Sequence, residues 1–334
     1  MSKLEANRRM PELLAPAGGM EQLNAALRYG ADAVYGGMAR YGLRAGASNF
    51  DAAAFPRAVE AAHALGKPFY VTLNLLPFDR DMAGYLAAAR EAHAAGADAA
   101  IVSDIGAALM LRDALPALPL HISTQANVLN TRTALHFHEA TGAQRIVLSR
   151  ELSLDDIRAM RQALPDSLQL EAFVHGAMCV AHSGRCLLST ALTGRSANRG
   201  ECAQPCRWAY HVAEETRPGV YMPVAAEERG THIFSAYDLC MLPHLPALVG
   251  AGIASLKIEG RMKTAYYVAT VVSSYRRALD ALASGGEAVY RALLPELMAE
   301  LDKASHRKSN TGFYFGAPQP AAGAGGYEQA MEFV

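Results

Sequence analysis

Residues 12–37, ELLAPAGGMEQLNAALRYGADAVYGG, set the pattern that most of the chain repeats. The stretch begins with a short apolar run at residues 12–17 and continues into helical spacing at about 20–29. It ends in a second β-type run at residues 33–37. Short apolar runs that alternate with helical spacing are typical of β/α units built on a parallel sheet. This segment therefore predicts an α/β fold.

Further strand-like runs follow, and most of them precede ten or more residues with helical spacing. Eight such units match a closed (β/α)8 barrel of the TIM type. A doubly wound open sheet is the alternative, but the turn PAGG at residues 16–19 lacks the G-x-G-x-x-G spacing of such sheets. The later strands are predicted at residues 69–75, 100–103, 118–124, 145–149, 168–174 and 254–258, with helices near 52–65, 82–95, 154–164 and 264–283.

The barrel is assigned to residues 11–315, with a long cysteine-rich insertion at residues 176–251 after the seventh strand. Such an insertion lies at the C-terminal face of a barrel, where the active sites of barrel enzymes are found. Residues 1–10 are predicted to be a disordered tail. Residues 316–334 are predicted to be a linker that leads into a frayed end or into the start of a missing C-terminal domain. Two strands of a small hairpin are expected inside the insertion, at residues 208–212 and 231–236.

The charge balance argues against a chain coated in positive charge. The chain has 334 residues, and its 31 Lys and Arg against 32 Asp and Glu give a net charge of −1, although a local basic patch stays open. The N-terminal residues are polar and lack the apolar region of an export signal. Each long apolar stretch is interrupted by charged residues or His before it reaches the length of a membrane span. We therefore expect a cytoplasmic protein without a membrane span.

All five cysteines lie in one part of the chain, and their spacing points to metal chemistry. Cys179 and Cys186 form a C-x6-C pair, Cys202 and Cys206 form a C-x3-C pair, and Cys240 stands apart. An odd number of cysteines without an export signal argues against a disulfide framework. Zinc sites favour C-x2-4-C pairs, which only one pair satisfies, whereas iron–sulfur clusters tolerate wider spacing. The sequence thus leaves open an iron–sulfur cluster, zinc, or buried thiols without a metal.

The chain contains several long motifs, which are LLAPAGGMEQLNAALRYGADAVYGG at residues 13–37, EAFVHGAMCVAHSGRCLLS at 171–189, NRGECAQPCRW at 198–208, SAYDLC at 235–240, SLKIEGRMK at 255–263 and TGFYFG at 311–316. These motifs resemble those of the peptidase U32 family, also called collagenase-like. Within this family, the chain is most similar to the bacterial tRNA wobble-uridine hydroxylation proteins. Other relatives act in hydroxylation of ribosomal RNA cytidine or of a ubiquinone precursor.

The resemblance implies a four-iron–four-sulfur cluster on four cysteines. Cys179, Cys186 and Cys202 carry over by motif position. Cys206 matches the C-x3-C of the RNA-hydroxylating relatives and is preferred as the fourth ligand, with Cys240 as the runner-up. Zinc remains the alternative metal.

The function implied by the resemblance is hydroxylation of a tRNA base, forming 5-hydroxyuridine, with prephenate as a linked co-substrate. The alternatives are oxygen-independent hydroxylation of a ubiquinone precursor, U32-type peptidase activity and a non-enzymatic role as a cluster-bearing partner subunit. The expected partner is therefore tRNA, with a quinone precursor as the alternative and a partner protein not excluded. The peptidase name finds little support in the residues, because the sequence has neither an H-E-x-x-H nor a G-x-S-x-G motif.

Side chains at the C-terminal ends of the predicted strands should converge on one face of the barrel. Glu171 and Glu259 are candidates for a proton-handling pair, or for carboxylates that hold Arg and Lys partners in place. His175 lies four residues before Cys179 and is expected to hydrogen-bond near the cluster instead of ligating it. The candidate catalytic residues are Glu171, His175, Glu259 and Arg261.

Basic side chains near the insertion are candidates for binding anions. Arg150 and Lys257 are the candidate cofactor-binding residues, since an anionic molecule of the prephenate kind suits an arginine. A basic rim for RNA is expected from Arg185, Arg195, Arg199, Arg207, Arg261 and Lys263. For any single one of these six residues, an ordinary solvated side chain is the favoured interpretation. The other side chains predicted at strand ends are Tyr35, Asn74, Asp104 and Gln125.

Overall fold

The eight parallel strands of the chain close into a barrel. The computed structural model describes residues 10–44, 47–179, 181–208, 211–213, 221–223 and 237–316. Each of the eight strands pairs with its neighbour in chain order. The eighth strand pairs with both the seventh and the first, which closes the barrel and excludes an open doubly wound sheet. The barrel strands are β1 (Glu12–Ala17), β2 (Ala33–Gly37), β3 (Phe69–Leu73), β4 (Ala99–Val102), β5 (Leu120–Ile122), β6 (Arg145–Val147), β7 (Gln169–Ala177) and β11 (Ser255–Ile258).

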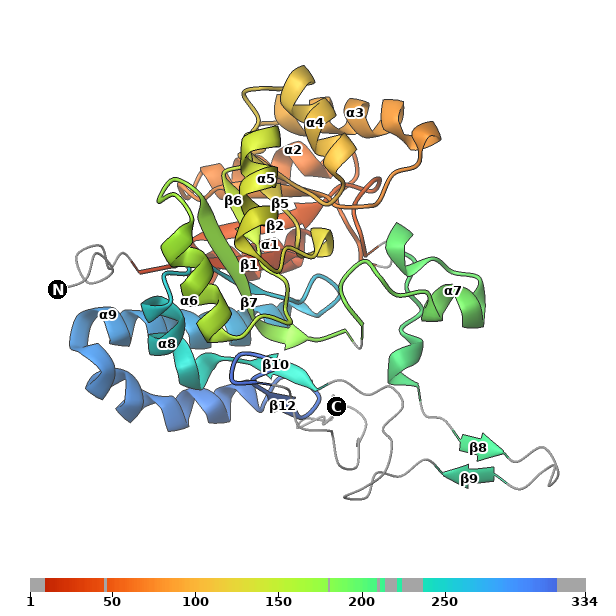
Figure 1. Cartoon of the computed structure of the whole chain (residues 1–334). Coiled ribbons are helices and arrows are strands. Elements are labelled where there is room, and N and C mark those ends of the chain that lie inside the picture. The colour runs from red at the N-terminus through yellow and green to blue at the C-terminus, as the bar shows by residue number, and fades with distance from the viewer. Residues whose placement is uncertain are drawn as a thin grey trace.

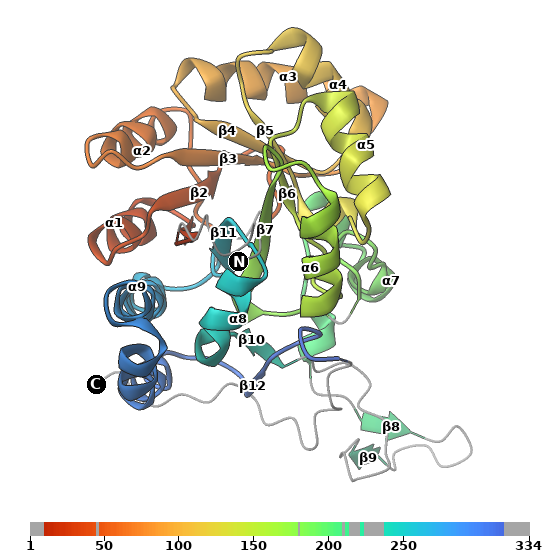
Figure 2. The same cartoon turned by 60° about the vertical axis from the view of Figure 1, so that its left-hand side comes forward.

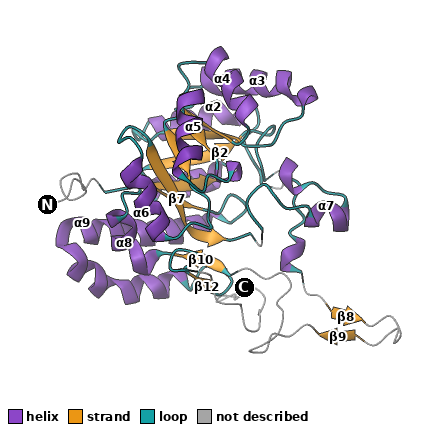
Figure 3. Ribbon diagram, in the orientation of Figure 1, coloured by secondary structure: helices purple, strands orange, loops and turns teal. Residues whose placement is uncertain are grey.

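Helices surround the strands on the outside of the barrel (Figures 1, 2 and 3). Their apolar faces and the outward-facing strand residues form the main core, while a smaller apolar cluster fills part of the barrel interior. No helix within the described ranges is both long and apolar enough to cross a membrane. The surrounding helices are α1 (Met20–Arg28), α2 (Ala54–His63), α3 (Asp79–Ala94), α4 (Ile105–Ala114), α5 (Thr131–Thr141), α6 (Leu154–Ala163), α8 (Leu245–Gly250) and α9 (Ala265–Leu301).

Two elements are longer than the sequence predicts. Strand β7 continues past residue 174 to Ala177, because its last residues pair antiparallel with β10 (Asp238–Cys240). Helix α9 continues past residue 283 to Leu301 across a bend at Gly286, where a φ of 68° interrupts the helical backbone. Glycine adopts this left-handed conformation without steric cost, so the chain bends there and then resumes a helix. Strand β12 (Ser309–Asn310) adds to β10.

The described residues of the cysteine-bearing segment between β7 and β10 form only short helices and strands. The segment holds α7 (Leu188–Thr193), the short helices η2 (Ala197–Arg199) and η3 (Pro205–Arg207), and the strand pair β8 (His211–Ala213) and β9 (Tyr221–Pro223). The partner of β8 is β9, whereas the second hairpin strand predicted at residues 231–236 lies outside the described residues. Of the predicted tails at residues 1–10 and 316–334, residues 1–9 and 317–334 also lie outside them.

A buried ion cluster joins four strands inside the barrel. The carboxylate of Glu171, whose residue is 0% exposed, accepts from Lys257 Nζ at 2.7 Å and from Arg145 at 3.0 Å. Arg145 also donates to Glu12 at 2.7 Å. Burial raises the pKa of Glu171, but the two adjacent cations outweigh burial and hold this pKa at about 2. The cluster thus ties β1, β6, β7 and β11 together across the barrel closure.

We predict that Glu171→Gln lowers the free energy of unfolding by about 3–5 kcal/mol, because it leaves two cations buried without their shared anion. Urea unfolding at pH 7 measures this loss. Because folding depresses the pKa of Glu171 to about 2, its contribution is complete above about pH 4.5 and decreases as the pH falls towards 2. Glu287→Gln, which removes an exposed partner of Arg291, is the control and should change stability by less than about 1 kcal/mol. Equal urea midpoints for the two variants would contradict the prediction.

Candidate functional site

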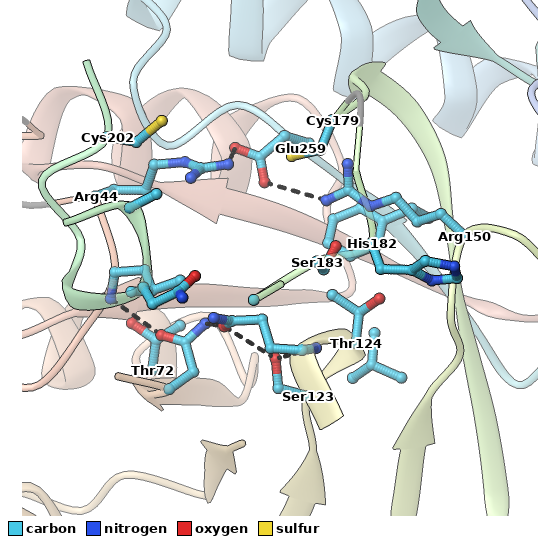
Figure 4. Close-up of a pocket in the computed structure, with 18 of the residues that line it drawn as sticks. Arg44, Thr72, Ser123, Thr124, Arg150, Cys179, His182, Ser183, Cys202 and Glu259 are labelled. Atoms are coloured by element: carbon cyan, nitrogen blue, oxygen red, sulfur yellow. Dashed lines mark hydrogen bonds and ion pairs between the residues drawn. The ribbon is translucent and has the colours of Figure 1, made fainter. Parts of the chain in front are cut away.

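A cavity of about 130 Å³ lies at the C-terminal mouth of the barrel (Figure 4). Side chains from the ends of seven barrel strands and from the cysteine-bearing segment line it together. Figure 4 shows Cys179, Cys202 and Glu259 on one side of the cavity, with Thr72 and Ser123 on the opposite side. The mouth of the barrel therefore contains the expected convergence of chemically active groups.

The four preferred cysteines all contribute to this cavity. Cys179, Cys186, Cys202 and Cys206 line it, whereas Cys240 is buried on β10 away from it. Burial raises the pKa of the Cys240 thiol. In the part of the chain that the structure describes, no three His, Cys, Asp or Glu side chains lie close enough together to hold a metal ion. The four cysteines that line the cavity fit a soft metal or cluster by the chemistry of their sulfur donors, and Cys240 does not line it.

Glu259 lies between two arginines at the rim of the cavity. Its carboxylate is 3.4 Å from Arg44 and 4.0 Å from Arg150, and all three side chains line the cavity. The Arg150 guanidinium stacks on the Phe173 ring at 3.9 Å and donates to the Ala177 carbonyl at 2.8 Å. Glu259 raises the pKa of Arg44 above its ordinary value. This group can offer cationic N–H donors to an anion that displaces the Glu259 carboxylate.

Arg261 is buried and holds the loop that follows β2. Its guanidinium donates to the Leu43 carbonyl at 2.8 Å, to the Thr72 hydroxyl at 3.0 Å and to the side chain of Asn49. Burial lowers the pKa of Arg261 to about 10. Because Leu43 precedes Arg44, these bonds fix the loop that carries Arg44 to the rim. The structure thus gives Arg261, predicted as catalytic, the contacts of a positioning residue.

Two glycines make room for Arg261. A Cβ on Gly18 would lie 2.0 Å from the Arg261 carbonyl oxygen, and a Cβ on Gly37 would lie 2.2 Å from its guanidinium. Both distances are far below van der Waals contact. The first glycine of the PAGG motif, directly after β1, is therefore required because the backbone of residue 261 passes close to it.

Lys257 connects the cavity to the ion cluster beneath it. Its ammonium lies 4.3 Å from the centre of the Tyr35 ring, and both residues line the cavity. The Tyr35 hydroxyl donates to the Ile258 carbonyl at 2.8 Å. Glu171 does not line the cavity and reaches it only through its ion pair with Lys257. The two carboxylates predicted as a pair, Glu171 and Glu259, are therefore in separate environments.

A second hollow of about 440 Å³ shares the cysteine side of the cavity. Cys179, Cys202, Cys206, Arg44 and Glu259 line both spaces, so the cysteines lie between them. Two members of the predicted basic rim, Arg195 and Lys263, line the outer hollow, whereas Arg199 pairs with Asp81 at 2.8 Å.

The model of peptidase family U32 matches residues 18–323 of the chain. The chain belongs to this family. It is 41% identical to "tRNA hydroxylation protein P1" of Bacillus subtilis over 96% of this chain and 73% of the relative. It is 36% identical to "tRNA hydroxylation protein P" of Escherichia coli over 91% of this chain and 74% of the relative. It is also 40% identical to "23S rRNA 5-hydroxycytidine C2501 synthase" of Escherichia coli over 81% of this chain and 39% of the relative.

In this U32 chain, His175 does not line the cavity. Its ring packs against Tyr267 and Tyr275, with centroids 6.1 and 5.5 Å away, on the side of β7 that faces α9. Strand alternation from Glu171 and Phe173 predicts that residue 175 points inward, but the register between β7 and β11 shifts just before it. Such a bulge re-aims the side chains that follow it. Sequence periodicity does not reveal a bulge, so it could not place His175.

We predict that replacing His175 changes the pH dependence of stability. Burial lowers the pKa of His175 to about 4, below its ordinary value of 6.5, so the unfolded chain takes up this proton first. Stability should therefore fall as the pH falls from about 6.5 to 4. Between pH 7 and 5, wild type should lose roughly 2 kcal/mol more than His175→Gln in urea unfolding. The exposed-site variant His136→Gln should keep the wild-type slope, and an unchanged slope in His175→Gln would contradict the prediction.

Proposed function

We propose that this chain takes part in hydroxylation of a tRNA base, forming 5-hydroxyuridine at the wobble position. The observation that carries the proposal is the gathering of four cysteines at the edge of a cavity whose walls also carry arginines and amides. The relatives named for tRNA and ribosomal RNA hydroxylation support it, because their similarity spans 81–96% of this chain. An enzyme of this kind needs a pocket for a base that has left its stack.

We propose further that Cys179, Cys186, Cys202 and Cys206 hold a four-iron–four-sulfur cluster. Four thiolates are the usual ligands of such a cluster, and the four side chains share one cavity. When bound, the cluster would supply one-electron transfer at the cavity edge. The chain's own residues bind and orient the substrate around it. A cysteine that ligates a metal cannot also be a free nucleophile, which argues against thiol peptidase chemistry at this site.

The cationic rim suits an anionic co-substrate of the prephenate kind. Arg44 and Arg150 already bind a carboxylate, that of Glu259, and a carboxylate of the co-substrate could replace it with the same geometry. The outer hollow carries Arg195 and Lys263, which suit the phosphates on either side of an inserted base. In this arrangement the base and the co-substrate approach the cysteines from the barrel side, and the RNA backbone remains in the outer hollow.

Serine substitution distinguishes the proposed cluster ligands from Cys240. We expect Cys179→Ser and Cys206→Ser, purified without oxygen, to lose most of their iron and visible absorbance, because a cluster needs all of its thiolates. Cys240→Ser should keep wild-type iron, since its thiol lies away from the cavity. Full iron in Cys206→Ser, or loss confined to Cys240→Ser, would overturn the ligand set. A colourless, zinc-loaded protein that remains active would overturn the cluster.

The reaction can be tested in a bacterial host that lacks its own tRNA hydroxylation protein. Expression of the wild-type chain should restore 5-hydroxyuridine in total tRNA, measured by mass spectrometry of the nucleosides. Arg150→Met should lower its amount at least tenfold, since loss of a charged hydrogen bond to a bound anion is worth about 1.5–3 kcal/mol. Arg158→Met, at an exposed ion pair with Asp155, is the control and should behave as wild type. Absence of 5-hydroxyuridine with a soluble wild-type chain would contradict the proposed function.

A further inference from the structure

We infer that the side-chain amide of Gln125 recognises a carbonyl oxygen of the target base, the O4 of uridine. This inference rests on the proposed function, since it names the atom by which the same cavity selects its substrate. Gln125 lies in the short helix η1 (Thr124–Ala126) directly after β5, and it lines the cavity at the barrel mouth. It is 5% exposed.

The orientation of the Gln125 amide is fixed by a chain of hydrogen bonds that starts at the backbone. The Leu43 N–H, which can only donate, binds Asn74 Oδ1 at 3.1 Å. Asn74 must therefore present its Nδ2 on the other side, and this group donates to Gln125 Oε1 at 2.8 Å. A flipped Gln125 amide would place two donors face to face. The Nε2 group is thus left as the donor that faces away from Asn74.

This donor is buried and has no hydrogen-bond partner in the described part of the chain. Buried polar groups in folded proteins are nearly always paired, so an exception at a cavity wall is open to a partner from outside the chain, either ordered water or a ligand. Two other buried N–H donors of lining side chains, Nε of Arg150 and Nε of Arg261, also lack a partner there. Among the described lining residues, no buried side-chain acceptor lacks a hydrogen-bond partner. The unpaired groups of the cavity wall are therefore all donors, which suit a ligand rich in acceptor oxygens.

The backbone that carries this amide is also held in place, which a specificity group requires. The Gln125 backbone carbonyl accepts from Asn127 Nδ2 at 2.7 Å, and the same Asn127 amide donates to the Ser183 carbonyl at 2.9 Å. A Cβ on Gly184 would lie 3.2 Å from the Gln125 Cβ, so the cysteine-bearing segment packs directly on this residue. Gln125 is thus fixed between the barrel and the segment that carries the proposed cluster ligands.

A fixed donor distinguishes the two pyrimidines of RNA. Uracil presents a carbonyl oxygen at position 4, whereas cytosine presents an amino group there. The Gln125 Nε2 donor can hydrogen-bond to the uracil oxygen, whereas it would face another donor in the cytosine amino group. A glutamate at this position would keep the acceptor that Asn74 needs but would replace the donor by a second acceptor, which suits the amino group of cytosine.

The test compares anticodon stem-loop RNAs that carry uridine or cytidine at the wobble position, with Kd measured by fluorescence anisotropy on the whole protein. Wild type should bind the uridine loop more tightly. Gln125→Leu should bind it about tenfold more weakly and bind the cytidine loop unchanged. Gln125→Glu should prefer the cytidine loop. Gln144→Glu, at an exposed glutamine before β6, is the matched control and should bind both loops as wild type does. Thermal unfolding verifies that all variants fold.

The outcomes separate this inference from the proposed function. If wild type restores 5-hydroxyuridine in cells but Gln125→Leu binds the uridine loop as wild type does, Nε2 meets only water and the inference is overturned. Equal affinity of wild type for the two loops also overturns it. If wild type forms no 5-hydroxyuridine, the proposed function fails, and the inference fails with it. Reversed loop preference in Gln125→Glu, together with restored 5-hydroxyuridine by wild type, supports both.

Discussion

A carboxylate with no access to solvent is the constraint on which this barrel depends. Glu171 can remain charged there only because Lys257 and Arg145 contact it, and each of the three residues comes from a different strand. Moving a lone carboxylate out of water costs far more than one domain can supply. The strands must therefore adopt the register that brings these groups together. The same interaction fixes part of the cavity, since the Lys257 side chain that binds Glu171 also lines the cavity.

The fold was largely predictable, because its signals are periodic and local. The alternation in residues 12–37 recurs in most of the later units, and the closed sheet confirms the predicted barrel. The end of α9 was not predictable, since the Gly285–Gly286 pair resembles a helix stop and only packing of the following turns continues the helix. The extension of β7 depends on β10, which lies sixty residues later in the chain.

The site was predictable in composition but not in geometry. The clustering of cysteines in sequence identified the four thiols that line the cavity, while their separation from Cys240 required the fold. Arg261 was expected at the reacting centre, yet its two terminal guanidinium nitrogens donate to Leu43, Thr72 and Asn49, contacts that no spacing rule reveals. Gln125 was predicted only as a strand-end residue. Its orientation depends on Asn74 and on one backbone N–H, contacts that exist only after three strand ends meet.

The pairing of Asp238 with Ala177 has a consequence for how this protein can change over evolution. The cysteine-bearing segment leaves the barrel at Ala177 and returns beside the same residue, so its two ends are already joined by the β7–β10 ladder. The entropic cost of closing such a loop grows only slowly with its length. Residues can therefore be gained or lost at a distance from the cysteines with little effect on barrel stability. The segment can therefore change its length on one unchanged scaffold.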